Sequence, residues 1–252
     1  MLNETQIVDN YTKLISTITS EFSGERQENL LKMYEHFGNR IVVAPASSIE
    51  HFHCAYPGGY IEHIFNVYDN AIEMVKLFAK QGGKIDFTAE EVKFSALHHD
   101  LGKIGSLKYD GYIEQESDWH RKNQGSIYIM NPNNQWMGYS DRTIFLLNSF
   151  NISLTEVEYL TIKLTDGLFD PGNDPYLKSF NKDKQLHSSL PLIMHWADHM
   201  ATRIEYLNWK SDAEDTKKAV SKKYAKILHS DIISTPEPKI VEKFEDIFKE
   251  ED

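Results

Sequence analysis

Apolar residues recur at three- and four-residue spacings along much of this chain, which is the period of a helix with one buried face. The longest such patterns cover residues 4–20, 60–80 and 190–209. A helix is also expected from Ser23, a good N-cap, to about His36. Shorter helices are predicted at about 120–130, 140–149 and 154–165, the last opened by Ser153 with Glu156 three residues later. The pattern predicts an all-α fold.

One further helix has a clear start and a clear end. Thr88 followed by Glu91 forms a capping-box pattern, and the helix that it opens is expected to end near Gly102. The stretch from Arg40 to Pro57 has no helical period and is predicted to be a loop. In LKYDGYIEQ, Asp110-Gly111 lies between residues that favour strands, which predicts a small β-hairpin near 107–115.

The chain is predicted to form a single domain over residues 1–252. Its core is expected at about 41–210, with N-terminal helices in 1–40 and a helical extension in 211–252 built from segments 213–229 and 238–250. Residues 168–185 (LFDPGNDPYLKSFNKDKQ) have the composition of a long surface loop, which is suited to act as a lid.

Composition narrows the class of protein. A hydrophobic fraction of 40% and a charged fraction of 26% over 252 residues are those of an ordinary globular protein. No apolar run is long enough to span a membrane, no signal peptide is recognisable, and the lone Cys54 fits a reducing compartment, so a cytoplasmic protein is expected. A net charge of -11 disfavours extended contact with nucleic acid, and the oligomeric state is open.

Candidate chemistry gathers at the end of the predicted helix that starts at Thr88. His99 and Asp100 are followed closely by Lys103, so an imidazole, a carboxylate and an ammonium meet where the chain turns. Imidazole nitrogens and carboxylate oxygens are common ligands of divalent ions. Two further ligands are available in His63, in the first turn of a helix, and Asp198, in a helix that is otherwise apolar. A buried carboxylate requires a cation or strong donors.

Ordinary structural roles compete with these interpretations. His63 alone would also suit a hydrogen-bonded core histidine, and Asp198 would also suit pairing with Arg203 or with a helix N-terminus. His98 points about 100° away from His99 on a helix and is expected to pack. The aromatic residues at helical spacings are interpreted as core rather than as base-stacking platforms; they are Phe65, Tyr68, Phe94, Trp196 and Tyr206.

Three segments in order resemble the HD superfamily of metal-dependent phosphohydrolases: EH at 62–63, HHDLGK at 98–103 and WADHMA at 196–201. The resemblance covers about residues 51–205. The segment FHCAYPGGYIEH is similar to the HHAYxxGLxEH segment of HD-domain 3′–5′ exoribonucleases, and WHRKNQGSIYIMNP resembles phage-encoded HD hydrolases. The resemblance implies an HD-domain helical bundle, and it allows a phage-encoded protein that acts in the cytoplasm of a bacterial host.

The resemblance also implies roles for individual residues. Metal ligands are expected at His63, His99, Asp100 and Asp198, and catalytic roles at Lys103, Asp100 and His120. Substrate contacts are expected from His53, Lys103 and Arg121, with Glu62 as a weaker candidate for proton acceptor. Relatives with two metals have two more His ligands; here His120 offers one, whereas Thr165 stands where the other is expected. One divalent ion is therefore favoured (Mn, Fe, Mg, Co, Ni or Zn), with a second, recruited by Asp166 or His120, left open.

The function expected from these features is hydrolysis of a phosphate ester or anhydride in a small phosphorylated substrate, a nucleotide above all, by metal-activated water. Three alternatives stay open. One is 3′–5′ exonucleolytic cleavage of single-stranded nucleic acid, which the net charge opposes. The others are a di-iron oxygenase, which needs six ligands, and a module that binds a nucleotide without turnover.

Overall fold

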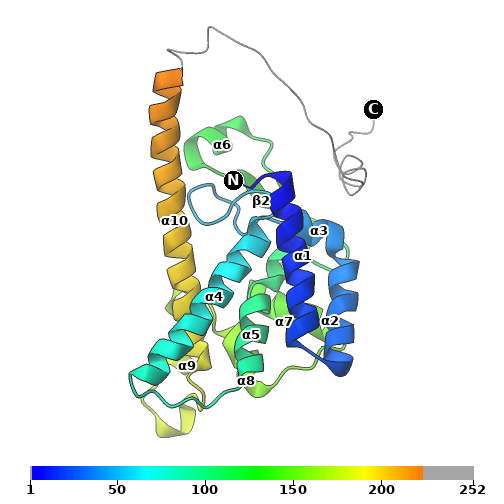
Figure 1. The fold of residues 1–252 in the computed structure, drawn as a ribbon, viewed down its shortest axis with the longest axis vertical. Coiled ribbons are helices and arrows are strands. Elements are labelled where there is room, and N and C mark those ends of the chain that lie inside the picture. Colours follow the sequence, from blue (N-terminus) through cyan, green and yellow to red (C-terminus); the bar gives the residue numbers. More distant parts are fainter. Residues whose placement is uncertain (1, 224–252) are drawn as a thin grey trace. The chain divides into compact units, whose positions relative to one another are not determined.

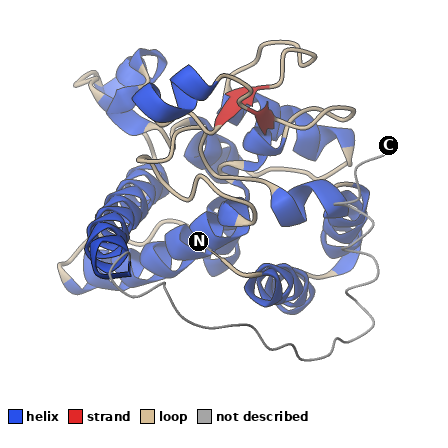
Figure 2. Cartoon of the chain, turned by 90° about the horizontal axis from the view of Figure 1, so that it is seen from above, coloured by secondary structure: helices blue, strands red, loops and turns tan. Residues whose placement is uncertain are grey.

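The computed structural model describes residues 2–223, and their side chains as far as residue 212. The fold is all-α with one small antiparallel sheet, as the sequence predicts (Figures 1 and 2). The chain divides into two compact units, Met1–Lys210 and Ser211–Asp252, and the site described below lies in the first. Within the described residues, no helix is both long and apolar enough to cross a membrane. The single-domain interpretation stays a prediction.

The N-terminal part contains three helices: α1 (Glu4–Glu21), α2 (Gly24–His36) and α3 (Gly38–Val43). The first two are confirmed. Ser23 is the N-cap of α2, although its side chain makes no capping hydrogen bond. The loop expected from Arg40 onward was wrong for the first four residues, because α3 is one short helix that buries only Ile41 and is too brief to show a period.

Helices α4 (Gly59–Lys80) and α5 (Ala89–His98) pack against each other at the centre. The capping box of Thr88 and Glu91 is confirmed, with both reciprocal hydrogen bonds present. A short 3₁₀ helix, η1 (Leu101–Ile104), follows α5 and packs on α7 (Tyr139–Ser149). The large core side chains come from these elements and from α1 and α2: Leu14, Ile18, Leu30, Tyr34, Ile61, Ile64, Phe94, Leu97, Leu101 and Leu146.

The small sheet pairs β1 (Tyr112–Glu114) with β2 (Tyr128–Met130). Strand β1 lies inside the predicted stretch 107–115, but its partner is β2 rather than residues 107–109. The tight turn occurs earlier, where Gly105 (φ +107°) forms a bridge with Asp110. The predicted helix at 120–130 was wrong after residue 124, because α6 (Asp118–Gln124) ends at Gly125 in a left-handed conformation and the chain then enters β2.

Helix α8 (Glu156–Lys163) starts two residues later than the pattern indicated. Its capping box is formed by Thr155 and Glu158 instead of Ser153 and Glu156. Glu158 is also the buried partner of Arg26, at 2.5 Å, so this carboxylate both caps α8 and ties it to α2. The shift follows from this tertiary contact, which a local pattern does not contain.

The predicted loop after α8 is irregular but contains several short turns: η2 (Gly167–Phe169), η3 (Pro171–Asn173), α9 (Asp174–Leu177) and η4 (Lys182–Lys184). Helix α10 (Leu190–Lys223) follows and extends well beyond the predicted end at 209. It covers part of the segment expected at 213–229, whereas the helix expected at 238–250 lies outside the described residues.

The buried face of α10 differs from the predicted face. Leu190, Met194, Ala197 and Ala201 join α4 and α5 in a second hydrophobic cluster. Trp196, which was expected to belong to the core, is 46% exposed, and Ile204 and Leu207 are exposed by 46% and 57%. The small residues Ala197 and Ala201 permit close packing against α4, and the larger residues lie to either side of this contact.

Gly59 permits a close backbone contact at the start of α4. A Cβ at this position would lie 2.0 Å from the carbonyl oxygen of Cys54. We expect Gly59→Ala to lower the free energy of unfolding by about 1–3 kcal/mol, because relief of such a clash displaces backbone. Thermal denaturation measures the change. Gly138→Ala is the control, since its nearest neighbour would lie 3.4 Å away; equal losses in both variants would contradict this assignment.

Candidate metal centre

Three helices bring the four predicted metal ligands together. His63 lies in the first turns of α4, His99 and Asp100 at the end of α5, and Asp198 in α10. The Nε2 atom of His63 lies 3.4 Å from Asp100 Oδ2 and 3.3 Å from Asp198 Oδ1. The Nε2 atom of His99 lies 3.5 Å and 3.9 Å from the same two oxygens. Residues far apart in sequence therefore form one cluster.

Hydrogen bonds fix the orientation of both imidazoles. Nδ1 of His63 lies 3.1 Å from both carboxylate oxygens of Glu205, and Nδ1 of His99 lies 2.8 Å from the carbonyl oxygen of Ala96. When each ring is neutral, Nδ1 therefore carries the proton and donates it, which leaves the lone pair on Nε2. Both lone pairs are directed at carboxylate oxygens, which cannot donate to them while ionised.

Several of the atoms that face one another in this cluster make no hydrogen bond. Nε2 of His63, Nε2 of His99 and Oδ1 of Asp198 are buried without a hydrogen bond within the described residues. Buried polar atoms without partners are costly, so several together indicate a missing cation or donor. These three atoms lie within 4.8 Å of one another, and a second triplet of His53, His63 and Asp100 meets the same limit. The groups could hold a metal ion.

The separations match those of ligands around a single ion. Ligand atoms about 2.1 Å from a common centre lie about 3.0 Å apart at octahedral angles and about 3.4 Å apart at tetrahedral angles. The four contacts from the two imidazoles to the two carboxylates range from 3.3 to 3.9 Å. The donor set of imidazole and carboxylate suits Mn, Fe, Co, Ni and Zn, so the residues present fit a divalent ion.

The electrostatics of the cluster favour a cation. Burial opposes charge on His63, yet the carboxylates of Glu205, Asp100 and Asp198 outweigh it and hold the pKa of this imidazole well above its usual value. Burial likewise disfavours ionised Asp100, but Lys103, His99 and His63 hold the pKa of this carboxyl well below its usual range. An ionised carboxylate and an Nε2 that attracts a proton make a site in which a metal competes with that proton.

Lys103 and His53 form one side of the cluster. The Nζ atom of Lys103 lies 2.6 Å from Asp100 Oδ2 and 3.2 Å from Nε2 of His53. Burial and the Lys103 ammonium lower the pKa of His53 to about 3, so this imidazole is neutral and accepts from the lysine. Asp100 in turn raises the pKa of Lys103 despite its burial. The site thus contains a permanent positive charge next to a neutral imidazole.

Asp166 approaches the cluster from the turn after α8. Desolvation and the charges of Asp100 and Asp198 raise the pKa of its carboxyl, while Lys103 and His99 act in the opposite direction. Its side chain is nevertheless exposed. The neighbouring Thr165 donates its hydroxyl to the carbonyl oxygens of Thr161 and Ile162, not to a residue of the cluster. A third carboxylate beside two others adds to the negative potential that attracts a cation.

Three other predicted site residues are not in the cluster. His120 lies in α6, where Nδ1 contacts the hydroxyl of Ser117 at 2.7 Å. Arg121 donates to the carbonyl of Gln115 and lies 3.8 Å from Glu114. Glu62 accepts from Tyr56 at 2.8 Å. Among the described residues, none of these three hydrogen-bonds or ion-pairs with a member of the cluster, so their predicted roles are not supported by a contact.

Glu205 is the residue that the sequence interpretation missed. It is buried, accepts from Asn66 at 2.7 Å and holds His63 in place. Burial disfavours its charge, yet His63 and Asn66 lower its pKa to about 2. The signal was present, because position 205 is seven residues after Asp198 and so lies on the same face of α10. For the same reason Asn66, three residues after His63, lies on the same face of α4 as His63.

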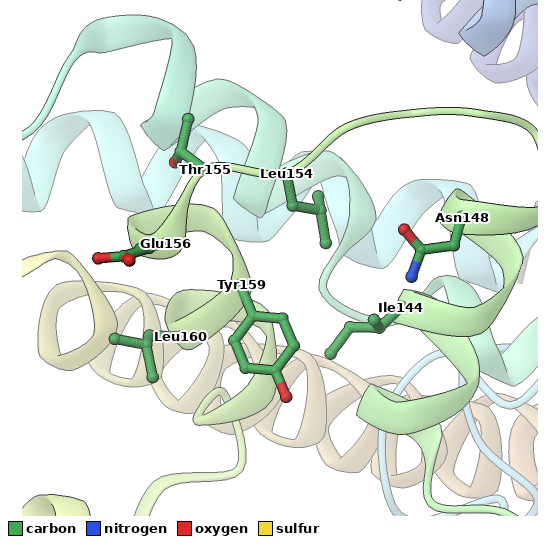
Figure 3. A pocket seen from close by; sticks show the side chains of 7 residues that line it. All are labelled: Ile144, Asn148, Leu154, Thr155, Glu156, Tyr159 and Leu160. Atoms are coloured by element: carbon green, nitrogen blue, oxygen red, sulfur yellow. The ribbon is translucent and has the colours of Figure 1, made fainter.

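A separate pocket of about 500 Å³ lies between α7 and α8 (Figure 3). Its lining residues are Ile144, Asn148, Leu154, Thr155, Glu156, Tyr159 and Leu160. None of them belongs to the His–Asp cluster, and Glu156 is the only charged side chain among them. The pocket is therefore not the candidate metal centre.

Comparisons with family models, with curated proteins and with solved structures find no match for this chain. The features of this chain that point to a function are the geometry of the cluster and the three sequence motifs that form it.

Removing the Glu205 carboxylate is expected to weaken metal binding. In Glu205→Gln, His63 keeps a hydrogen-bond partner but loses the charge that makes its Nε2 a stronger ligand, and we expect the dissociation constant for Mn²⁺ to rise about 10- to 100-fold. Isothermal titration calorimetry measures this constant. Glu73→Gln, on the exposed part of α4, removes a carboxylate that pairs only with Lys76 and serves as the control. Equal affinities for Glu205→Gln and the wild type would contradict the role of Glu205.

Proposed function

We propose that this chain is a metal-dependent phosphohydrolase of the HD type that acts on a nucleotide-like phosphate ester. The observation that carries the proposal is the meeting of two Nε2 lone pairs with two carboxylates in a buried cluster. The motifs EH, HHDLGK and WADHMA, which resemble the HD superfamily, supply these very residues. A divalent ion held by these residues would act as a Lewis acid toward a phosphoryl oxygen and would lower the pKa of water.

The residues around the ligands have distinct tasks in this proposal. His63, His99, Asp100 and Asp198 hold the ion, and Glu205 keeps Nε2 of His63 directed toward it. Lys103 brings an ammonium that neutralises the charge of a bound phosphate as the P–O bond breaks. His53 accepts from Lys103 and thereby holds this ammonium beside Asp100.

Charge argues for a small substrate. A net charge of -11 repels the backbone of a long nucleic acid, whereas one phosphate group can be balanced locally by a metal and by Lys103. We therefore propose a mononucleotide rather than an RNA or DNA strand. The lone cysteine fits action in the cytoplasm.

The direct test is release of inorganic phosphate from a panel of nucleoside mono-, di- and triphosphates. The protein is first freed of metal with a chelator and then assayed with Mn²⁺, Fe²⁺, Co²⁺, Ni²⁺, Zn²⁺ or Mg²⁺ added singly. Hydrolysis that requires one of these ions and is lost in Asp198→Asn supports the proposal. Shortening of a labelled oligonucleotide without nucleotide hydrolysis would favour the exonuclease alternative, and nucleotide binding without product would favour a non-catalytic module.

A further inference from the structure

Three aromatic rings form a cluster next to a ligand of the candidate metal centre. The ring of Phe169 lies 5.3 Å from that of His199 at an interplanar angle of 33°, and 6.1 Å from that of His195, which meets it edge-on at 61°. The rings of His195 and His199 lie 6.2 Å apart at 28°. Phe169 is 74% exposed, so much of its ring is open to solvent although two histidines hold it in place. An isolated exposed Phe is common, whereas an exposed Phe packed on two histidines beside a candidate ligand is less so.

Local contacts hold this ring cluster in position. Nδ1 of His195 lies 2.9 Å from the carbonyl oxygen of Thr165, and a Cβ on Gly167 would lie 2.2 Å from the His195 ring. Gly167 is therefore required to be glycine, both by this contact and by its φ of +53°. The amide of buried Asn173 donates to the carbonyl of Gly167 at 3.0 Å and fixes the turn that carries Phe169.

The ring cluster and the metal centre share two elements. His195 and His199 lie one turn before and one residue after the candidate ligand Asp198 on α10. Phe169 lies three residues after Asp166, whose carboxyl interacts electrostatically with Asp100, Lys103 and Asp198. In Figure 1 the segment with α9 lies beside the N-terminal part of α10. The ring cluster therefore belongs to the same two segments as Asp166 and Asp198.

We propose that the exposed ring of Phe169, flanked by His199 and His195, binds the base of the mononucleotide substrate. This inference rests on the function proposed above and adds to it the residue that binds the purine or pyrimidine. Stacking on an aromatic ring recognises any base, because each base has a flat π face. Three rings accommodate one base, and the acidic chain disfavours further nucleotides.

The test compares substrates that differ only in the base. AMP and UMP carry one, whereas ribose 5-phosphate does not. In Phe169→Ala with Mn²⁺ we expect KM for both nucleotides to rise about tenfold, with kcat and the KM for ribose 5-phosphate unchanged. Phe169→Trp keeps a stacking face and is expected to restore the wild-type KM. Phe180→Ala is the matched control, since Phe180 is 97% exposed in the same loop and belongs to no ring pair among the described residues.

A binding measurement on metal-free protein gives a readout apart from activity. Stacking quenches the fluorescence of 2-aminopurine riboside 5′-monophosphate, and we expect this quenching in the wild type and in Phe180→Ala but not in Phe169→Ala. Persistent quenching in Phe169→Ala, or an equal rise of KM for ribose 5-phosphate, would overturn the assignment.

The two proposals fail in different ways. Hydrolysis of nucleotides and of ribose 5-phosphate that Phe169→Ala leaves unaltered overturns the base site and leaves the phosphohydrolase intact. Hydrolysis of none of these esters by the wild type overturns the proposed function and this inference with it. Tighter binding of an oligonucleotide than of AMP would show that the rings bind an extended strand and would also overturn the assignment.

Discussion

His99→Ala is expected to lower the affinity for a divalent ion by more than about 100-fold and to abolish metal-dependent hydrolysis. The reason is that His99 supplies one of two imidazole nitrogens in the cluster, and loss of a direct ligand costs more than loss of an outer partner, which is worth about 10- to 100-fold. Calorimetric titration with Mn²⁺ and phosphate release measure the two effects.

The neighbouring His98 provides the control for this prediction. Its Nδ1 lies 2.7 Å from the carbonyl of Phe94, and its ring packs 4.4 Å from that of Phe94 in the core. Burial lowers its pKa to about 3, so it is neutral. His98→Leu preserves the apolar surroundings and is expected to keep metal affinity close to that of the wild type. Equal losses in the two variants would mean that the region, and not the His99 ligand, had been disturbed.

Lys103→Met is expected to lower kcat about 100- to 1000-fold while metal binding persists. The ammonium lies next to Asp100, so its removal takes away the group that balances the charge of a phosphate. Loss of one such electrostatic contact costs about 2.7–4 kcal/mol of transition-state stabilisation. Steady-state kinetics at saturating Mn²⁺, with a parallel titration of metal affinity, separate the two properties.

Lys163→Met is the matched control, because Lys163 also pairs with an aspartate at 2.6 Å but lies away from the cluster, next to Asp141. It is expected to keep the wild-type kcat. A Lys103→Met protein with wild-type kcat would remove Lys103 from the catalytic account, and one that no longer bound metal would show that the lysine acts through the structure of the ligand cluster.

Local sequence patterns predicted most helices, because the caps and the apolar period of a helix are contained in its own residues. The capping box at Thr88 and the period of residues 60–80 depend on residues close in sequence, and both are confirmed. The partner of β1, the start of α8 and the exposed face around Trp196 depend on contacts between distant segments. A local pattern cannot contain these contacts, and those details were wrong.

The same distinction applies to the site. His63 was predicted from its place in the first turn of a helix, and Asp198 because a buried carboxylate in an apolar helix needs a partner. The structure brings both to His99 and Asp100. Glu205 was missed because it lies in a charged part of the helix, where the sequence does not indicate that a carboxylate is buried or has a partner. His120 was expected from the resemblance alone, and it lies outside the cluster because α6 directs it toward Ser117.

The most direct test of the central claim is a crystal structure of the protein equilibrated with Mn²⁺, examined for anomalous scattering. The account predicts a peak about 2.1–2.3 Å from Nε2 of His63, Nε2 of His99 and a carboxylate oxygen each of Asp100 and Asp198. A folded, Mn²⁺-saturated protein with no peak between these four side chains, or with the ion bound elsewhere, would contradict it.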